Sequence, residues 1–295
     1  MTPIAELAKE TAARVEARLN ELLPAEDVQP ATLHKAMRYS IFAGGKRIRP
    51  LLCIESAKAC GGDEDDALNA ACALETLHTY TLIHDDLPCM DNDDMRRGRP
   101  TNHKVFGEGV AVLAGDALLT EAFAILARVP SNERYTVGDY VAEFAYRTGS
   151  LNLVGGQVLD LEGEGRELSV DELRAIHNGK TSALIMASTR LGGMVAGCTP
   201  EQLDALTAYG RDLGLAFQII DDILDITSSP EVLGKSIGKD AAVHKATYPA
   251  LVGMDQARRE ARDLTASARA ALEVFSPKRR EALLAINDYL LNRDY

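Results

Sequence analysis

Apolar residues recur along this chain at spacings of three and four positions, the period of an amphipathic α-helix, whereas the alternating runs typical of strands are scarce. The clearest helix runs from Ala67 to Asp85, and Pro88 then opposes its continuation. A second helix runs from about Glu201 to Ile226. Other segments, several of them apolar around the whole circumference, read as further helices of a bundle interior: 115–129, 140–161 and 170–197. The pattern predicts an all-α fold, built as a single large helical bundle.

The stretches that interrupt this pattern are short and lie at 20–30, 91–103, 163–167 and 228–245. None of them is a low-complexity linker or a block of charge that would mark a domain boundary. With 46% hydrophobic residues among 295, the chain has enough apolar side chains for one large core. We therefore expect one domain that spans residues 1–295.

The composition narrows the range of partners. A formal net charge of -12 argues against nonspecific binding to nucleic acid or to an anionic bilayer surface. No apolar run approaches the roughly 20 residues of a transmembrane helix, and the first 20 residues mix acids and bases, unlike a signal peptide. Five scattered cysteines without a CxxC pair indicate neither a zinc site nor a disulfide framework. A soluble protein of the reducing cytoplasm is the simplest expectation, without membrane insertion.

Two clusters of aspartates stand at the ends of the two clearest helices. The first contains Asp85, Asp86 and Asp91, followed by Asp93 and Asp94, and the second contains Asp221, Asp222 and Asp225. Like charges one helical turn apart destabilise a helix by about 0.2–0.5 kcal/mol, so a compensating cation is expected. Hard divalent cations prefer oxygen ligands, and Mg²⁺ is commonly shared between one or two carboxylates and substrate phosphates. The clusters therefore indicate magnesium bound together with a phosphorylated substrate.

A solvated acidic face is the alternative interpretation of each cluster. It is disfavoured at the second cluster because apolar residues such as Phe217 and Leu224 flank the aspartates. At the first cluster, taken alone, it stays open because acidic loops are common. A calcium-binding EF-hand loop beginning at Asp91 is excluded, since Arg96 and Asn102 stand where Gly and Glu are required.

Basic residues gather beside glycines and beside the aspartates. They are Lys46, Arg47 and Arg49 after a pair of glycines, Arg96 and Arg97 after the first cluster, Lys180 beside Thr181, and Lys235, Lys239 and Lys245 after the second cluster. Any one of them alone would be read as a solvated surface charge. Their grouping in a strongly acidic chain indicates a site for a polyanion held with metal.

These features together resemble the trans-isoprenyl diphosphate synthase family. The resemblance is carried by the aspartate motifs DDLPCMD and DDILD, and by GGKRIRP, HNGKTSALI, GLAFQIIDDILD and KATYPAL in the same order. The four-residue gap within the first motif is similar to that of bacterial farnesyl synthases and plant-type geranylgeranyl synthases. The resemblance implies an isoprenoid synthase bundle with a central apolar cavity, and a homodimer.

The resemblance also implies residue roles. The metal ligands would be Asp85, Asp86, Asp91, Asp221 and Asp225, holding three Mg²⁺ ions with Asp222 nearby, and Mn²⁺ as a possible substitute. The allylic diphosphate would contact Arg96, Lys180, Lys235 and Lys245, with Lys239 matched in only part of the family. Isopentenyl diphosphate would contact Lys46, Arg49, His78 and Arg97, and the reaction site would be lined by Thr181 and Gln218.

The implied activity is a magnesium-dependent 1'-4 head-to-tail condensation of isopentenyl diphosphate with dimethylallyl or geranyl diphosphate, giving farnesyl diphosphate. Catalysis would come from neutralising the leaving diphosphate and positioning the second alkene, without a covalent nucleophile. Alternatives in the same family are geranylgeranyl or geranyl diphosphate synthases. A terpene cyclase is disfavoured because Asp221, Asp222 and Asp225 replace its usual Asn, Ser and Glu. A regulatory synthase subunit is disfavoured because such subunits commonly lose an aspartate motif.

Product length is expected to depend on the wall of the cavity below the first aspartates. Thr81, four residues before Asp85, lies most directly beneath it, whereas Tyr80 is rotated by about 140° but has the longer side chain. Spacing alone favours Thr81. Within the family, an aromatic residue five positions before the motif resembles farnesyl synthases, so Tyr80 favours farnesyl diphosphate as the product.

If Tyr80 limits chain growth, Tyr80→Ala lengthens the product because it opens the cavity. Chromatography of the products of the purified enzyme measures this directly. An unchanged chain length would contradict the assignment of Tyr80.

Overall fold

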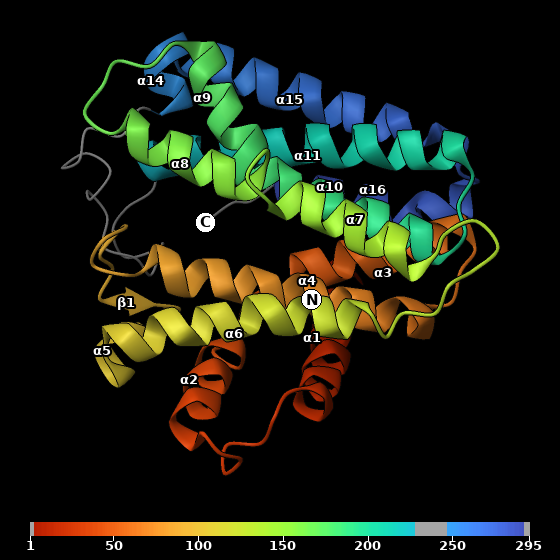
Figure 1. Cartoon of the computed structure of the whole chain (residues 1–295). Coiled ribbons are helices and arrows are strands. Elements are labelled where there is room, and N and C mark those ends of the chain that lie inside the picture. Colours follow the sequence, from red (N-terminus) through yellow and green to blue (C-terminus); the bar gives the residue numbers. More distant parts are fainter. Residues whose placement is uncertain (1–2, 228–246, 292–295) are drawn as a thin grey trace.

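The computed structural model describes residues 3–227 and 247–291, and it confirms the all-α prediction (Figure 1). Within these residues the strands are two residues each, β1 (Met95–Arg96) and β2 (Arg99–Pro100), which pair as an antiparallel hairpin. All five cysteines are free thiols, as the sequence indicated. The chain is therefore a helical protein with one small hairpin.

The helices follow one another with short connections. The first part of the chain forms α1 (Pro3–Leu22), α2 (Ala31–Ile41), α3 (Ile48–Cys60), α4 (Glu64–Asp85), α5 (Asn102–Phe106), α6 (Glu108–Leu126) and α7 (Val137–Thr148). The second part forms α8 (Leu153–Gly163), α9 (Val170–His177), the π-helical turn η1 (Asn178–Ser182), α10 (Ala183–Val195), α11 (Pro200–Thr227), α14 (Tyr248–Val252), α15 (Met254–Ala271), the 3₁₀ turn η2 (Leu272–Val274) and α16 (Pro277–Leu291).

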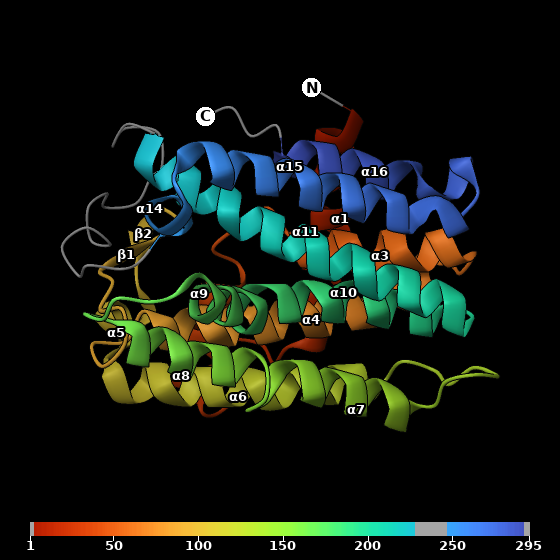
Figure 2. The ribbon, with the colours of Figure 1, turned by 90° about the horizontal axis from the view of Figure 1, so that it is seen from above.

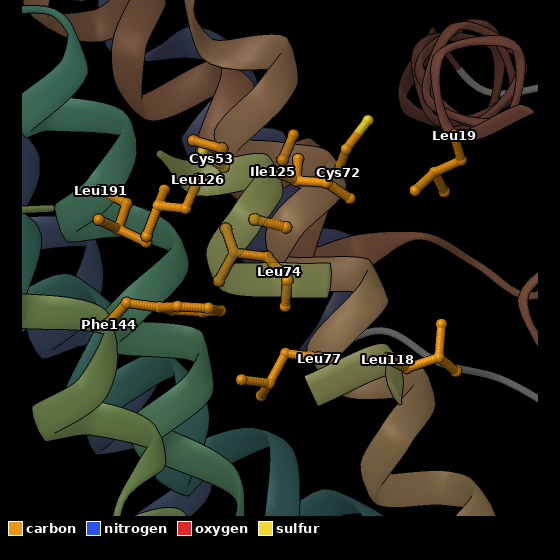
Figure 3. Packing of buried hydrophobic residues seen from close by; sticks show 14 of the residues in the cluster. Leu19, Cys53, Cys72, Leu74, Leu77, Leu118, Ile125, Leu126, Phe144 and Leu191 are labelled. Carbon is orange, nitrogen blue, oxygen red and sulfur yellow. The ribbon is translucent and has the colours of Figure 1, made fainter. Parts of the chain in front are cut away.

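Helix α4 lies at the centre of the bundle, packed against α3, α6 and α10. The long helices run side by side in both views, whereas α1 and α2 cross them (Figures 1 and 2). Figure 3 shows Leu74 and Leu77 of α4 near Leu118 of α6, with Phe144 of α7 and Leu191 of α10 on the other side. All five side chains are fully buried. Such close packing leaves α4 little freedom to move relative to its neighbours.

Both aspartate-bearing helices have the predicted extent and end at the same end of the bundle. Helix α4 begins at the N-cap Asp63, whose side chain accepts the Asp65 amide at 2.8 Å, and it ends at Asp85. Helix α11 ends at Thr227, one residue beyond the predicted Ile226. The carboxyl ends of α4 and α11 lie near the hairpin in both views (Figures 1 and 2).

The prediction of one continuous helix over 140–161 is wrong. Helix α7 ends at Thr148 and α8 begins at Leu153. The backbone of Gly149 is extended, and Asn152 donates a hydrogen bond from its side chain to the Tyr146 carbonyl at 2.9 Å. Apolar spacing continues across this break, but glycine and an asparagine that bonds the backbone both favour leaving the helix.

Helix α6 is more apolar than the sequence analysis anticipated. Among the described residues it alone is long and apolar enough, by length and composition, to cross a bilayer, with 19 residues and a mean hydropathy of 1.7. It packs along α4, as core helices of soluble proteins do. Val112 and Leu113 lie on its outer face, 38% and 58% exposed.

The contact of α10 with α3 depends on Gly192, where a Cβ atom would lie 2.0 Å from the Cys53 carbonyl oxygen. We expect Gly192→Ala to lower the free energy of unfolding by about 1–3 kcal/mol, because the helices must move apart. Gly109→Ala on α6 is the control, since a Cβ there has no neighbour within 4 Å. The control is expected to be neutral or stabilising by about 0.5–1 kcal/mol in urea unfolding. Equal losses in both variants would contradict this account.

Candidate active site

The loop after α4 folds back onto the end of the helix. The amide of Asp91 donates to the Asp85 carbonyl at 2.9 Å, and the amide of Asp93 donates to the Asp86 carbonyl at 3.2 Å. Asn92 reverses the chain with a φ of 51°, in the left-handed region that asparagine tolerates well. The fold thus returns Asp91 to Asp85, although six positions separate them in the sequence.

Asp86 points into the protein and pairs with Arg96. Its Oδ1 accepts hydrogen bonds from Arg96 Nε at 2.7 Å and Nη2 at 2.6 Å, and the residue is only 3% exposed. Burial raises the pKa of Asp86 to about 6, against the opposing effect of Arg96. Burial also raises the pKa of Asp85, while Lys180 acts in the opposite direction. Arg96, predicted to contact substrate, is here held by Asp86.

The β-hairpin carries the next arginine to a different loop. Its turn residues, Arg97 and Gly98, both have positive φ, as a two-residue type I′ turn requires. Arg97 Nη1 donates to the Gly44 carbonyl. A Cβ atom at residue 45 would lie 2.6 Å from Arg97 Cζ, so Gly45 permits this close approach.

Arg97 joins a group of cations around His78. Arg49 Nη1 and His78 Nε2 lie 3.2 Å apart, and burial lowers the pKa of Arg49 to about 10. Burial, reinforced by Arg49 and Arg97, lowers the pKa of His78 well below its usual value, so the imidazole is neutral and accepts from Arg49. Lys46 is exposed on the same loop. The four residues predicted to hold isopentenyl diphosphate thus lie around one loop and one turn of α4.

Arg47, counted from the sequence among the cations beside the glycines, faces the other way. Its side chain is 0% exposed and forms ion pairs with Glu75 at 2.6 Å and Glu16 at 2.9 Å. The alternation of neighbouring side chains in an irregular loop cannot be read from residue type, because a lysine or arginine is suitable for either side.

The π-helical turn η1 forms the opposite wall. Lys180 Nζ lies 2.8 Å from Asp160 Oδ2 on α8, and Thr181 Oγ1 donates to Gln218 Oε1 on α11 at 2.8 Å. The turn packs closely on α8, since a Cβ at Gly156 would lie 2.3 Å from the Lys180 amide nitrogen. Asp160 was missed by sequence reasoning, because a single carboxylate among 44 acidic residues gives no signal apart from the preceding glycines. Isolated π-turns are frequent at functional sites.

The second aspartate cluster is divided between interior and surface. Asp222 is 8% exposed, and it accepts the Tyr248 amide at 2.8 Å and Gln218 Nε2 at 3.2 Å. Burial raises the pKa of Asp222 to about 7. Asp221 is half-buried and Asp225 is exposed. A solvated acidic face is therefore the wrong description of Asp222, whose carboxylate instead anchors the start of α14.

The two walls face one another across the end of the bundle. Lys180 influences Asp85 on α4, and Asp221 on α11 favours the charged form of Arg49. A cavity of about 570 Å³ opens on the α11 side and is lined by Asp160, Leu173, Ile176, His177, Lys180, Thr181, Gln218, Asp222, Asp225 and Thr247. Lys235, Lys239 and Lys245 lie outside the described residues.

The donor set suits magnesium shared with a ligand. Within residues 3–227 and 247–291, no three His, Cys, Asp or Glu side chains are already gathered to hold an ion alone. The available donors are carboxylate oxygens, with Asp91 folded back to Asp85 and with Asp221 and Asp225 one turn apart. Mg²⁺ needs only one or two carboxylates when phosphate oxygens and water complete its shell. The residues present therefore fit the ion.

The two candidates for chain-length control face different neighbours. The ring of Tyr80 packs edge-on against His84, with centroids 5.0 Å apart, and His84 Nε2 lies 3.0 Å from the Val112 carbonyl of α6. Thr81 donates from its hydroxyl to the His78 carbonyl at 2.8 Å. Tyr80 thus lies toward α6, and Thr81 stays near the cation group.

The fold and site define an all-helical protein that binds a polyanion between two carboxylate motifs. Residues 30–276 match the polyprenyl synthetase family, and the chain belongs to this family. It is a trans-prenyltransferase that elongates prenyl chains head to tail in isoprenoid biosynthesis. Enzymes of the family require a divalent metal, Mg²⁺.

Plant enzymes and a bacterial structure illustrate the similarity. The chain is 48% identical over 270 residues to the chloroplastic geranylgeranyl pyrophosphate synthase of Catharanthus roseus, covering 90% of this chain and 75% of that protein. It is 48% identical over 271 residues to the large subunit 1 of a heterodimeric chloroplastic geranylgeranyl pyrophosphate synthase of Arabidopsis thaliana, covering 90% and 73%. The crystal structure of an FPP/GFPP synthase from Zymomonas mobilis superposes with a TM-score of 0.88 at 35% identity, covering 97% of this chain and 98% of that one.

These relatives correct one expectation drawn from the sequence. The cytoplasmic location is contradicted, because the plant relatives are described as chloroplastic. Free cysteines and a negative net charge indicate a reducing compartment but do not distinguish one such compartment from another.

The neutral state of His78 predicts a specific pH dependence. The native state binds fewer protons at this residue than the unfolded chain, so stability relative to His78→Gln falls as pH decreases through about 6.5. The expected slope is up to about 1.4 kcal/mol per pH unit. Urea unfolding between pH 5 and 8 measures it, with His34→Gln on α2 as the control. Parallel stability curves for wild type and His78→Gln would overturn this prediction.

Proposed function

We propose that the protein is a geranylgeranyl diphosphate synthase. It adds isopentenyl diphosphate to dimethylallyl, geranyl and farnesyl diphosphates in the presence of Mg²⁺, and it releases the C20 diphosphate. Elongation is supported by two separate groups of cations beside the aspartate motifs, one for each diphosphate. The C20 product is supported by the 48% identity to plant geranylgeranyl synthases and by the small side chain of Thr81 near Asp85.

In this proposal the allylic diphosphate lies between the two aspartate motifs. Asp85 and Asp91 would hold Mg²⁺ from α4, and Asp221 with Asp225 would hold it from α11. Lys180 would contact the diphosphate directly, fixed by its 2.8 Å ion pair with Asp160. When bound, Mg²⁺ neutralises charge that develops on the leaving diphosphate.

Isopentenyl diphosphate would occupy the group formed by Lys46, Arg49, His78 and Arg97. Arg49 and Arg97 supply planar donors that suit diphosphate oxygens, and the neutral His78 keeps Arg49 in place through the 3.2 Å contact. A terpene cyclase needs no second diphosphate site of this kind, so this group is the observation that carries chain elongation.

The chain's own groups then guide the reaction between these subsites. Cleavage of the allylic carbon–oxygen bond leaves a cation, which the alkene of isopentenyl diphosphate attacks to form the new carbon–carbon bond. The proton lost afterwards passes to the departed diphosphate. Thr181 and Gln218, bonded to each other at 2.8 Å, line this position and orient the reacting groups. Buried neighbours such as Leu173 keep water from trapping the cation.

Farnesyl diphosphate is the second candidate product. Tyr80 is the specific observation in its favour, because its half-buried ring narrows the side of α4 that faces α6. The Zymomonas mobilis relative is described as an FPP/GFPP synthase, so both shorter and longer products occur among similar proteins.

We also infer that the catalytic unit is one domain and that two copies associate. Apolar side chains are exposed on α6 and α8, including Leu113 at 58% and Val158 at 47%. Such a surface is typical of a contact between identical subunits. One relative is described as part of a heterodimer, so a partner of similar fold is the alternative.

Incubation of the purified protein with Mg²⁺, dimethylallyl diphosphate and isopentenyl diphosphate tests the proposal. We expect a linear C20 diphosphate and complete loss of turnover with a chelator. A C15 end product supports the second candidate, a cyclic hydrocarbon supports a cyclase, and an inactive wild type revives the regulatory subunit.

Asp85→Asn and Asp221→Asn should each lower kcat by at least about a hundredfold, because leaving-group neutralisation is lost. Asp204→Asn is the matched control, since this aspartate is exposed on α11 outside the site. Full activity of either motif variant would contradict the assignment of magnesium ligands.

A further inference from the structure

We propose that Arg47 and Glu75 form a buried positioning pair that sets the affinity of the isopentenyl diphosphate subsite without touching the substrate. The inference rests on the proposed function, because it concerns the subsite formed by Lys46, Arg49, His78 and Arg97. It assigns a role to two buried residues that the mechanism above does not use.

Arg47 is held on all sides by hydrogen bonds. Its Nη1 donates to Glu75 Oε1 at 2.6 Å, and its Nη2 donates to the Ile41 carbonyl at 2.6 Å and to Glu16 Oε1 at 2.9 Å. These partners come from α4, from the end of α2 and from α1, so one guanidinium joins three helices. Its side chain is 0% exposed, which removes it from direct contact with a solvent-borne substrate.

The backbone at Arg47 needs this support. The residue has φ 49° and ψ 39°, a left-handed conformation that costs a non-glycine residue about 1–2 kcal/mol. Gly44 and Gly45 before it also have positive φ, so the loop has no regular structure to fix its shape. The side-chain bonds of Arg47 therefore hold the loop, and Lys46 and Arg49 stand on either side of this fixed point.

Glu75 provides the buried negative charge beneath the whole group. It is 1% exposed and lies one helical turn before His78 on α4. Its charge opposes the effect of burial on Arg47, and likewise on Arg49 and Arg97. Cations gathered in a poorly solvated region repel one another unless a counterion offsets them. Glu75 thus allows the arginines to stay charged and close together before a diphosphate arrives.

A comparable ion pair elsewhere separates positioning from simple stabilisation. Arg190 Nε lies 2.6 Å from Glu143 Oε1, joining α10 to α7, with side chains 16% and 11% exposed. Neither residue lines the described cavities or approaches the aspartate motifs. Loss of this pair should lower stability in the same way while leaving both diphosphate subsites intact.

Steady-state kinetics of Glu75→Gln and Arg47→Lys test the inference, with Glu143→Gln as the matched control. We expect the KM for isopentenyl diphosphate to rise at least about tenfold in both variants, because the cations lose their fixed geometry. The KM for the allylic diphosphate should change less than about twofold. The control should lose thermal stability with both KM values unchanged.

The double variant Arg47→Met/Glu75→Leu addresses folding. Replacing a buried ion pair by apolar residues is often neutral or stabilising, so this variant should keep its Tm and still show the raised KM for isopentenyl diphosphate. Glu16→Gln, which removes one bond at a side chain 40% exposed, should give a smaller rise.

The outcomes distinguish the two levels of inference. If the wild type elongates prenyl chains but the folded variants keep the wild-type KM for isopentenyl diphosphate, or raise both KM values equally, the positioning role is overturned. If the wild type shows no elongation with isopentenyl diphosphate, the proposed function itself fails.

Discussion

The structure depends on how it compensates charge at one end of an otherwise apolar bundle. A buried charge without a partner is costly, and this end contains many of both signs. Asp86 pairs with Arg96, Glu75 with Arg47 and Asp160 with Lys180. Each pair joins segments that are far apart in the sequence, so electrostatic compensation also determines which loops meet. The bundle supplies stability, and these pairs determine the shape of the site.

One face of α4 connects the separate tasks of the site. Glu75, His78 and Asp85 follow one another at spacings close to whole helical turns, with Thr81 between the last two. This face therefore carries a buried counterion, a neutral imidazole, a candidate for chain-length control and a metal-binding carboxylate in register. Because α4 is packed on every side, their relative positions are fixed by the geometry of a single helix.

The sequence was a good guide to what depends on local periodicity. The limits of α4 and α11 followed from apolar spacing and proline, and the aspartate motifs indicated the family. The break between α7 and α8 was missed, because apolar residues continue across Gly149. The sequence could not distinguish buried Arg47 from exposed Lys46, nor identify Asp160 as the partner of Lys180, since both depend on contacts between distant segments. The orientation of Tyr80 toward His84 was also beyond helical geometry alone.

The small β-hairpin has a consequence for how the two substrates influence each other. Arg96 at its β1 end bonds Asp86 beside the metal-binding motif, and Arg97 in its turn bonds the Gly44 carbonyl beside the other cation group. Adjacent residues of one short, stiff element thus contact both halves of the site. A shift of the hairpin when one diphosphate binds also moves the other subsite. By thermodynamic linkage the two affinities are coupled reciprocally, so the enzyme senses its two substrates as a pair.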